Sequence, residues 1–204
     1  MGQIFRRAET YLDKLDPEEI GWFVEIGTSR AGDDSSTRTI AAWAARFGQQ
    51  LYTVDIDSNN INFVIEQGIT NVKTWTGSGE QFLQCFPENL GPISFLYLDN
   101  FDWDWHPDKT ESFVLEQQIR YKELGLEMTN VNSQRAHLEQ MIAALPLMAE
   151  KSIVVLDDTW YNKWWGHYSG KGGAVVPYLL ANDYHVLETE EQPVYGTIMG
   201  RGIV

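Results

Sequence analysis

The stretch Trp22-Phe23-Val24-Glu25-Ile26-Gly27-Thr28-Ser29-Arg30-Ala31-Gly32 decides the fold of this chain. It is a short apolar run that ends in an acid and a glycine, followed by small and polar residues and a second glycine. The apolar run Leu51-Tyr52-Thr53-Val54 comes one βαβ repeat later and ends in Asp55-Ile56-Asp57. A strand, a glycine-containing turn, a helix and a strand that ends in an acid are typical of the nucleotide-binding half of a doubly wound α/β sheet.

The composition indicates a globular protein with a core of its own. The 204 residues are 43% hydrophobic and 22% charged, which is ordinary for one domain. The net charge of −14 disfavours contact with phosphate backbones and anionic lipid, so we expect neither nucleic acid nor a membrane as partner. Cys85 is the single cysteine, and we expect it to be a buried structural thiol. No apolar run approaches the ~20 residues that span a bilayer and no signal core is evident, so we expect a cytoplasmic protein.

Strands and helices are predicted to alternate in a single domain over residues 1–204. A covering helix over 3–15 precedes the expected strands, which are 22–26, 51–55, 71–75, 93–98 and 152–156. We expect a helix that ends near Phe47, one that Ser58 caps with Ile65 facing inward, and others over 80–86, 133–149 and 172–182. Residues 101–132 are predicted to form an insertion over the carboxyl edge of the sheet. The runs 184–188 and 195–199 lie too close for a helical crossover, so they should pair antiparallel.

Over nearly its whole length the chain resembles the class I S-adenosylmethionine-dependent methyltransferases. Residues 24–32 look like the first motif of that family, and Asp55 stands where its ribose-binding acid ends strand two. Residues 76–79 look like the loop beside the adenine, and residues 96–99 look like motif four. The resemblance implies an α/β, doubly wound, Rossmann-like domain. Its mostly parallel seven-stranded sheet would have the order 3-2-1-4-5-7-6 and end in an antiparallel hairpin.

Ser29 stands where dinucleotide-binding enzymes have the glycine that admits a pyrophosphate. S-adenosylmethionine has no pyrophosphate, so this departure favours it as the cofactor. Gly27 lets the backbone approach the cofactor, and Asp55 can accept both ribose hydroxyls. Glu25 is expected to orient the turn and the cofactor's amino group. The expected cofactor-binding residues are Glu25, Gly27, Thr28, Ser29, Gly32, Asp55, Ile56, Gly77, Ser78, Gly79 and Asp99.

Two of these assignments have open alternatives. Asp57 can be the ribose ligand instead of Asp55, although a charge at a helix start is the favoured interpretation. Ser78 and Gly79 can bind the adenine or form a plain turn.

Three acids follow the strands predicted as four and five. The carboxyl ends of these strands are neighbours in a doubly wound sheet, so Asp99, Asp157 and Asp158 should meet in one cleft. Oxygen ligands suit Mg²⁺ or Ca²⁺. The set is similar to that of the metal-dependent catechol-type O-methyltransferases, with Asp158 in place of an Asn, and this similarity implies Mg²⁺ at the three acids. The alternative is a loop cap and one active-site acid without a metal.

The catalytic lysine of those enzymes would fall near Asp102, where this chain has an acid. Lys109 and Lys163 are the candidates to replace it. Lys171-Gly172-Gly173 has the composition of a phosphate cradle, but a flexible turn before a helix is the favoured interpretation.

The catalytic candidates are Asp99, Asp158, His106 and His167. Both histidines lie in aromatic segments that should hang over the cleft, His167 in an expected loop over 159–170. The tryptophans of these segments can stack on a sugar or aromatic acceptor, seal a lid, or form a homodimer patch.

We therefore expect an S-adenosylmethionine-dependent methyltransferase that acts at oxygen on a small molecule. One alternative is a fold that binds a nucleoside or sugar without transferring methyl. Another is an assembly protein that uses the tryptophan-rich insertion as an interaction surface, because a fold does not settle function.

Overall fold

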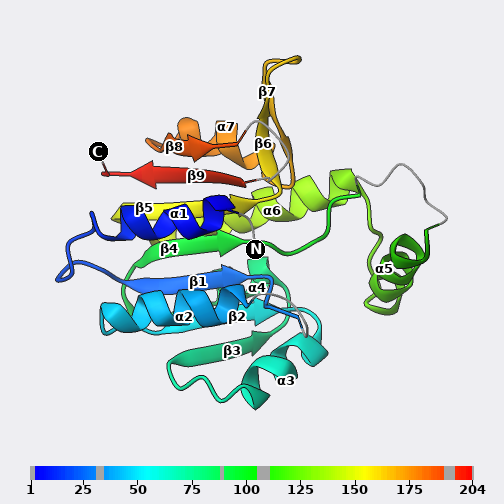
Figure 1. Cartoon of the computed structure of the whole chain (residues 1–204), viewed down its shortest axis with the longest axis horizontal. Coiled ribbons are helices and arrows are strands. Elements are labelled where there is room, and N and C mark those ends of the chain that lie inside the picture. Colours follow the sequence, from blue (N-terminus) through cyan, green and yellow to red (C-terminus); the bar gives the residue numbers. More distant parts are fainter. Residues whose placement is uncertain (1–2, 31–34, 88–89, 105–110, 191–195, 204) are drawn as a thin grey trace.

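In the computed structural model, which describes residues 3–30, 35–87, 90–104, 111–190 and 196–203, the described residues form a seven-stranded sheet (Figure 1). The strands lie in the order β3-β2-β1-β4-β5-β9-β8. Their bounds are β1 (Trp22–Ile26), β2 (Leu51–Asp55), β3 (Val72–Thr76), β4 (Ile93–Leu98), β5 (Met148–Asp157), β8 (His185–Thr189) and β9 (Gly196–Arg201).

β1 to β5 are parallel, and β9 is antiparallel to both β5 and β8. Because β8 and β9 are the sixth and seventh strands of this sheet, the predicted order 3-2-1-4-5-7-6 and the predicted fold class are confirmed.

The register of the central strands divides their side chains between two cores. Val24, Leu96 and Val154 are paired across β1, β4 and β5 and belong to one buried cluster. Their neighbours along the chain, which include Phe95 and Ile153, belong to the other. This alternation follows from the two-residue period of a strand. All of β4 is buried, as expected for a strand covered on both faces.

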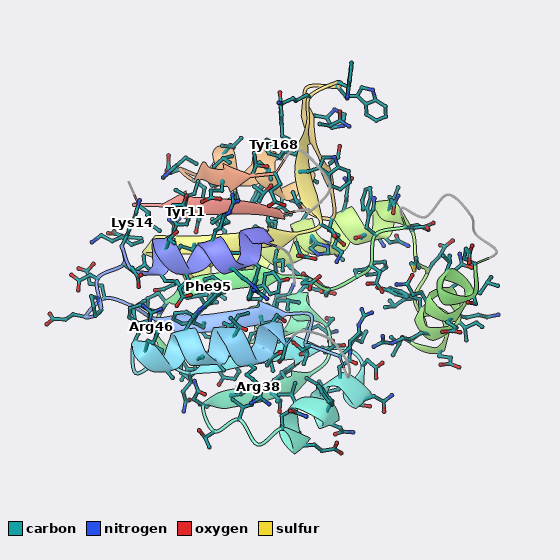
Figure 2. The ribbon with its side chains drawn as sticks, viewed as in Figure 1. Tyr11, Lys14, Arg38, Arg46, Phe95 and Tyr168 are labelled. Atoms are coloured by element: carbon teal, nitrogen blue, oxygen red, sulfur yellow. The ribbon has the colours of Figure 1, made fainter. Side chains whose placement is uncertain are left out.

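Helices cover both faces of the sheet. α1 (Gln3–Leu12) and α2 (Ser36–Arg46) pack on one face, where Phe95 lies between them (Figure 2). α4 (Gly79–Gln84), α6 (Asn130–Ala144) and α7 (Val175–Leu180) pack on the other. α3 (Ser58–Glu66) contacts β2 and β3 at one edge. Among the described residues, no helix is long and apolar enough to cross a membrane.

Several predicted boundaries and side-chain positions are wrong. Asp57, not Ser58, caps α3, because its carboxylate accepts the Asn59 N–H. Ile65, expected to face inward, is 58% exposed, and Cys85 is exposed at the end of α4. α6 ends at residue 144 because the 3-10 turn η2 (Leu145–Leu147) contains a proline, which lets β5 begin earlier than residue 152.

The loop predicted over 159–170 is instead a β-ribbon. β6 (Thr159–Asn162) pairs antiparallel with β7 (His167–Gly170), and the ribbon projects from the sheet (Figure 1). Its base is closed by Gly170, which has a φ of 87°. A Cβ there would lie 1.8 Å from the Asp158 carbonyl oxygen, so no larger residue fits. The ribbon returns the chain to the end of β5, and the Lys171 N–H donates to the Asp158 carbonyl at 3.0 Å.

α5 (Ser112–Glu123) stands beyond the carboxyl ends of the parallel strands (Figure 1). The Arg120 guanidinium donates to Asp57 Oδ2 at 2.8 and 3.0 Å, which ties α5 to the end of β2. The Asp102 N–H donates to the Tyr121 hydroxyl, and the Phe101 and Tyr121 rings lie 4.9 Å apart. Residues from the segment predicted as an insertion therefore lie over this edge of the sheet.

Candidate functional site

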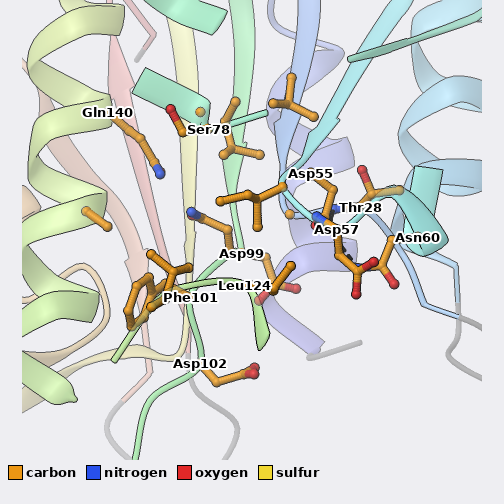
Figure 3. A pocket seen from close by; sticks show the side chains of 18 of the residues that line it. Thr28, Asp55, Asp57, Asn60, Ser78, Asp99, Phe101, Asp102, Leu124 and Gln140 are labelled. Atoms are coloured by element: carbon orange, nitrogen blue, oxygen red, sulfur yellow. Dashed lines mark hydrogen bonds between the residues drawn. The ribbon is translucent and has the colours of Figure 1, made fainter. Parts of the chain in front are cut away.

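A cavity of about 770 Å³ lies at the carboxyl ends of the parallel strands. This edge, where the strand order reverses between β1 and β4, is where open α/β sheets bind ligands. Figure 3 shows Asp55, Asp57 and Asn60 together on one side of the cavity, Gln140 and Phe101 on the other, and Asp99 between them. The predicted site residues that line it are Gly27, Thr28, Ser29, Asp55, Ile56, Gly77, Ser78, Gly79, Asp99, Asp157 and Asp158.

The turn after β1 crosses closely over the end of β4. Gly27 has a φ of 100°, and a Cβ on it would lie 2.5 Å from backbone atoms of Asp99 and Asn100. The Gly27 N–H donates to the Val54 carbonyl at 2.9 Å. A glycine is therefore required here for the backbone to pass between β2 and β4, which sets the floor of the cavity.

Glu25 lies beneath that turn, fully buried and not among the described residues that line the cavity. Its carboxylate accepts hydrogen bonds from the hydroxyls of Ser36 at 2.5 Å, Thr37 at 2.6 Å and Thr53 at 2.7 Å. Burial raises the pKa of Glu25 to about 7, although the three hydroxyls oppose this. Glu25 thus joins the turn to α2 and β2, and its expected contact with the cofactor's amino group is not supported by this geometry.

Asp55 and Asp57, the two alternatives for the ribose ligand, have different hydrogen-bond partners in the structure. The Asp55 carboxylate accepts the Asp57 N–H at 2.8 Å, the Asn60 amide at 2.9 Å and the Thr28 N–H at 3.1 Å. Burial nevertheless raises its pKa. A carboxylate has about four acceptor positions, so Asp55 keeps capacity for a ligand hydroxyl. Asp57 is taken up by the α3 cap and by the ion pair with Arg120.

The turn after β3 forms another wall. Ser78 caps α4, and its hydroxyl accepts the Gln81 N–H at 3.3 Å. A Cβ on Gly79 would lie 2.5 Å from Ile26 and 3.1 Å from the Gln140 amide, so this turn packs tightly against α6. Gln140 Oε1 and Asn100 Oδ1 are buried, and neither has a hydrogen-bond partner among the described residues. Both residues line the cavity, so it offers a ligand amide groups that the motifs did not predict.

The three acids after β4 and β5 do meet, as predicted, but a lysine lies among them. Lys171 Nζ is 2.8 Å from Asp99 Oδ1, 3.1 Å from Asp158 Oδ2 and 3.8 Å from Asp157 Oδ2. The Tyr97 hydroxyl donates to the other oxygen of Asp99 at 3.0 Å. The Lys171 side chain is 4% exposed, whereas that of Asp158 is 34% exposed and faces the cavity.

In this cluster the Lys171 ammonium and the Asp99 carboxylate stabilise each other's charged forms, whereas the charged form of Asp157 is disfavoured. Burial would lower the pKa of Lys171, but Asp99 and Asp158 outweigh it and hold that pKa well above its ordinary value. Burial would raise the pKa of Asp99, but the Lys171 ammonium outweighs it and lowers that pKa. For Asp157, burial and the Asp99 carboxylate together raise the pKa well above the ordinary value. Lys171 is therefore a permanent cation near neutral pH and does not act as a base.

The cluster does not fit the Mg²⁺ that the sequence implied. A magnesium ion needs its oxygen ligands at about 2.0–2.1 Å in octahedral geometry, and the Lys171 ammonium already lies where Asp99, Asp157 and Asp158 converge. Within the described ranges there is no group of three or more His, Cys, Asp or Glu residues that could hold a metal ion.

The remaining candidates lie elsewhere. His106, Gly32 and Lys109 fall outside the described residues. His167 is exposed on β7, where its ring stacks on Trp165 with 5.8 Å between centroids, and it is not among the described residues that line the cavity. The expectation that it hangs over the cleft is wrong, because strand pairing in the ribbon carries it outward. Asp102 forms an ion pair with Arg30 at 3.2 Å.

Sequence reasoning also missed two residues of the acid cluster, Tyr97 and Lys171. Tyr97 lies in an apolar strand, and only its position two residues before Asp99 hinted at a shared face. Lys171 was noted only as part of a glycine-rich turn. Its return to the end of β5 depends on the pairing of β6 with β7, which the Gly170 and Gly166 positions could have suggested as a hairpin signal.

No family model matches this chain, and no curated protein matches it. The O-methyltransferase NovP matches with a TM-score of 0.59 and 10% identity over 97% of this chain and 79% of that one. MycE from the mycinamycin biosynthetic pathway, solved with Mg, S-adenosylhomocysteine and mycinamycin VI, matches with a TM-score of 0.53 and 14% identity over 97% and 49%.

An rRNA methylase from Streptococcus thermophilus matches with a TM-score of 0.54 and 12% identity over 98% of each chain. These identities are too low to transfer an activity or a substrate. The likeness confirms the predicted resemblance at the level of the fold: this chain has the fold of the class I S-adenosylmethionine-dependent methyltransferases.

Proposed function

We propose that the protein transfers the methyl group of S-adenosylmethionine to a hydroxyl oxygen of a small molecule. One observation carries the proposal. A single cavity joins a half suited to the adenosyl group, formed by the Gly27 turn, Asp55 and Ser78, to a half with a cavity-facing carboxylate, Asp158. A cofactor that spans both halves would bring its sulfur to the acids after β4 and β5.

The charge of the cavity supports a cationic cofactor. Among the described residues that line it, nine carry carboxylates and four carry cationic side chains. An excess of negative charge favours the sulfonium of S-adenosylmethionine and repels a phosphate backbone. The same excess favours a small acceptor over an RNA, although one structure of similar fold is an rRNA methylase.

Asp55 and the opposite wall give the cofactor its orientation in this proposal. Asp55 accepts one ribose hydroxyl with its remaining lone pair. Ile56, which is 41% exposed in the cavity, packs against the adenine. The unpartnered amide oxygens of Asn100 and Gln140 accept hydrogen bonds from the ligand.

Methyl transfer then needs alignment and removal of one proton. The acceptor oxygen bonds to the methyl carbon as the bond from that carbon to sulfur breaks, and the electron pair of the broken bond stays on sulfur. The Asp158 carboxylate takes the hydroxyl proton, and S-adenosylhomocysteine and a methyl ether leave. Positioning and general base catalysis together can supply most of the acceleration of such a step.

Isothermal titration with S-adenosylhomocysteine tests the proposal. We expect one site per chain with a dissociation constant of about 1–100 μM, equivalent to about −8 to −5.5 kcal/mol. Release of S-adenosylhomocysteine from S-adenosylmethionine is then followed with sugar and phenol acceptors. No binding at a millimolar concentration of ligand would rule out the proposal.

A non-enzymatic assembly role has one observation in its favour. Trp164 and Trp165, at the tip of the β6–β7 ribbon, are 90% and 75% exposed. Binding of the cofactor product without turnover on any acceptor, together with a stable complex lost on Trp164→Ala, would support this second function.

A further inference from the structure

We propose that Lys171 takes the place of a divalent metal in this site, so that Asp99, Asp157 and Asp158 are held together by an ammonium group and the centre works without a metal ion. The catalytic part of this inference rests on the proposed methyl transfer. Its structural part does not, because it concerns only which cation the three acids hold.

The ammonium group pairs with all three acids. Lys171 Nζ donates to Asp99 Oδ1 at 2.8 Å and forms ion pairs with Asp158 at 3.1 Å and Asp157 at 3.8 Å. A metal bound by the same oxygens would overlap Nζ, so the two cations exclude each other. The side chain is 4% exposed, so it would have to break a buried ion network to move aside.

The backbone around Lys171 keeps it in place. Its N–H donates to the Asp158 carbonyl at 3.0 Å, and the next N–H, of Gly172, donates to Thr159 Oγ1 at 2.8 Å. Thr159 Oγ1 in turn donates to the Asp157 carbonyl at 2.9 Å. The segment that carries the cation is thus bonded to the segment that carries two of the acids, and the β6–β7 ribbon closes the loop between them.

One of the acids adopts an uncommon backbone conformation. Asp158 has a φ of 46°, in the left-handed region that residues other than glycine seldom adopt. Its carboxylate lies 3.1 Å from Lys171 Nζ, and the residue lines the cavity. Lys171 is therefore a positioning residue, because it acts through Asp99, to which its ammonium donates, and through Asp158, with which it forms an ion pair.

The arrangement also limits the class of acceptor. A metal ion can chelate two neighbouring oxygens of a catechol, whereas an ammonium group has no empty coordination position to accept their lone pairs, and this one is already paired with three acids. We therefore infer that an acceptor needs one hydroxyl at Asp158 and gains nothing from a second hydroxyl beside it.

Titration with Mn²⁺ followed by electron paramagnetic resonance tests the substitution, because bound Mn²⁺ loses the signal of the free ion. We use the full chain and Mn²⁺ alone as the probe, since oxygen-ligated Mg²⁺ sites commonly accept Mn²⁺. Wild type and Lys171→Arg, the charge-matched control, should leave Mn²⁺ free up to about 1 mM, the weak end of oxygen-ligated sites. Lys171→Ala should bind Mn²⁺ at least about tenfold more tightly than wild type, a difference of about 1.4 kcal/mol, and Asp99→Asn in that background should abolish the gain.

Two results would overturn the inference. The first is Mn²⁺ binding to wild type that Asp99→Asn removes. The second is a folded Lys171→Ala variant that gains no Mn²⁺ affinity. If Lys171→Ala does not fold, Lys171→Gln is titrated with Mn²⁺ in its place. The comparison of wild type with Asp99→Asn does not depend on either variant, and Mn²⁺ binding that Asp99→Asn removes still overturns the inference.

These outcomes are separate from those of the cofactor titration. A protein that fails to bind S-adenosylhomocysteine yet gains Mn²⁺ in Lys171→Ala would refute the proposed function and leave this inference standing. Binding of S-adenosylhomocysteine together with a Mn²⁺ site in wild type would support the proposed function and refute this inference.

Discussion

The cavity has two halves that are built in different ways. In the half formed after β1, β2 and β3, polar groups are tied by bonds within or between short motifs, as Asp55 is to Asp57 and Asn60. In the half formed after β4 and β5, the central group is Lys171, which the β6–β7 ribbon brings back to Asp158. The first half therefore depends on local turn geometry, and the second depends on a distant strand pairing. This difference predicts that the two halves can be damaged separately.

The largest expected effect separates chemistry from cofactor binding. Asp158→Asn should lower the rate of methyl transfer by about 10²–10⁴-fold, because the acceptor proton loses its base. The dissociation constant for S-adenosylhomocysteine should stay within about twofold, a difference of about 0.4 kcal/mol. Asp183→Asn is the matched control, since Asp183 is also an aspartate at positive φ but is exposed before β8. Equal loss of rate and of cofactor affinity in Asp158→Asn would contradict the separation of the halves.

A smaller effect concerns Glu25, which is buried beneath the turn after β1 in the cofactor half of the cavity. The pKa of Glu25 is raised from 4.5 to about 7 in the folded state, so its protonated form is favoured by folding. Its contribution to stability is full below about pH 4.5 and is lost as pH rises through 7. Glu25→Gln, which mimics the protonated form, should gain about 3 kcal/mol in free energy of unfolding relative to wild type between pH 4.5 and 8.

Urea unfolding at several pH values measures that gain. Glu150→Gln, on an exposed carboxylate of β5, is the control and should follow wild type at every pH. Parallel stability curves for Glu25→Gln and wild type would contradict this prediction. They would show that Glu25 is charged throughout the pH range and that its three hydroxyl donors are enough to stabilise the buried carboxylate.

Loss of the proposed ribose contact at Asp55 should weaken cofactor binding moderately and affect little else. Asp55→Ala should weaken binding of S-adenosylhomocysteine about 10–100-fold, or about 1.4–2.8 kcal/mol, because a ligand hydroxyl loses its charged acceptor. The turnover rate at saturating cofactor should change far less. Titration calorimetry measures the affinity of Asp55→Ala against that of the control Glu66→Ala. Glu66 is an exposed carboxylate on the neighbouring helix α3. Unchanged affinity in Asp55→Ala would remove Asp55 from the site.

The smallest effect tests the contact between α5 and the cofactor half. The Arg120–Asp57 pair is partly exposed, so Arg120→Met should weaken the cofactor product only about 3–10-fold. Lys122→Met, on an exposed position of the same helix, should leave the affinity at the wild-type value. If both variants behave alike, the ion pair does not hold α5 over the cavity.

The sequence was informative wherever one motif determines its own geometry. The bounds of β1 and β2 were predicted as they are, because an apolar run that ends in a turn with polar or glycine residues defines a buried parallel strand. The same local rules predicted Asp57 as a charge at the start of α3, although they assigned the cap itself to Ser58. The convergence of Asp99, Asp157 and Asp158 followed from strand order alone, since neighbouring parallel strands end at the same edge.

What could not be predicted depends on contacts between distant segments. His167 was expected over the cavity, but its direction depends on which residues of the ribbon pair. The position of Gln140 depends on how α6 packs against α4, and that of Arg120 on where α5 lies. Lys171 is the clearest case, because nothing in its surrounding sequence indicates that it pairs with three carboxylates.

A crystal structure with bound S-adenosylhomocysteine tests the central claim most directly. We predict that a ribose hydroxyl lies within hydrogen-bond distance of Asp55, that the sulfur faces Asp158, and that Lys171 keeps its contacts with the three acids without a metal between them. A ligand bound outside this cavity, or one whose sulfur points away from the ends of β4 and β5, would contradict the account.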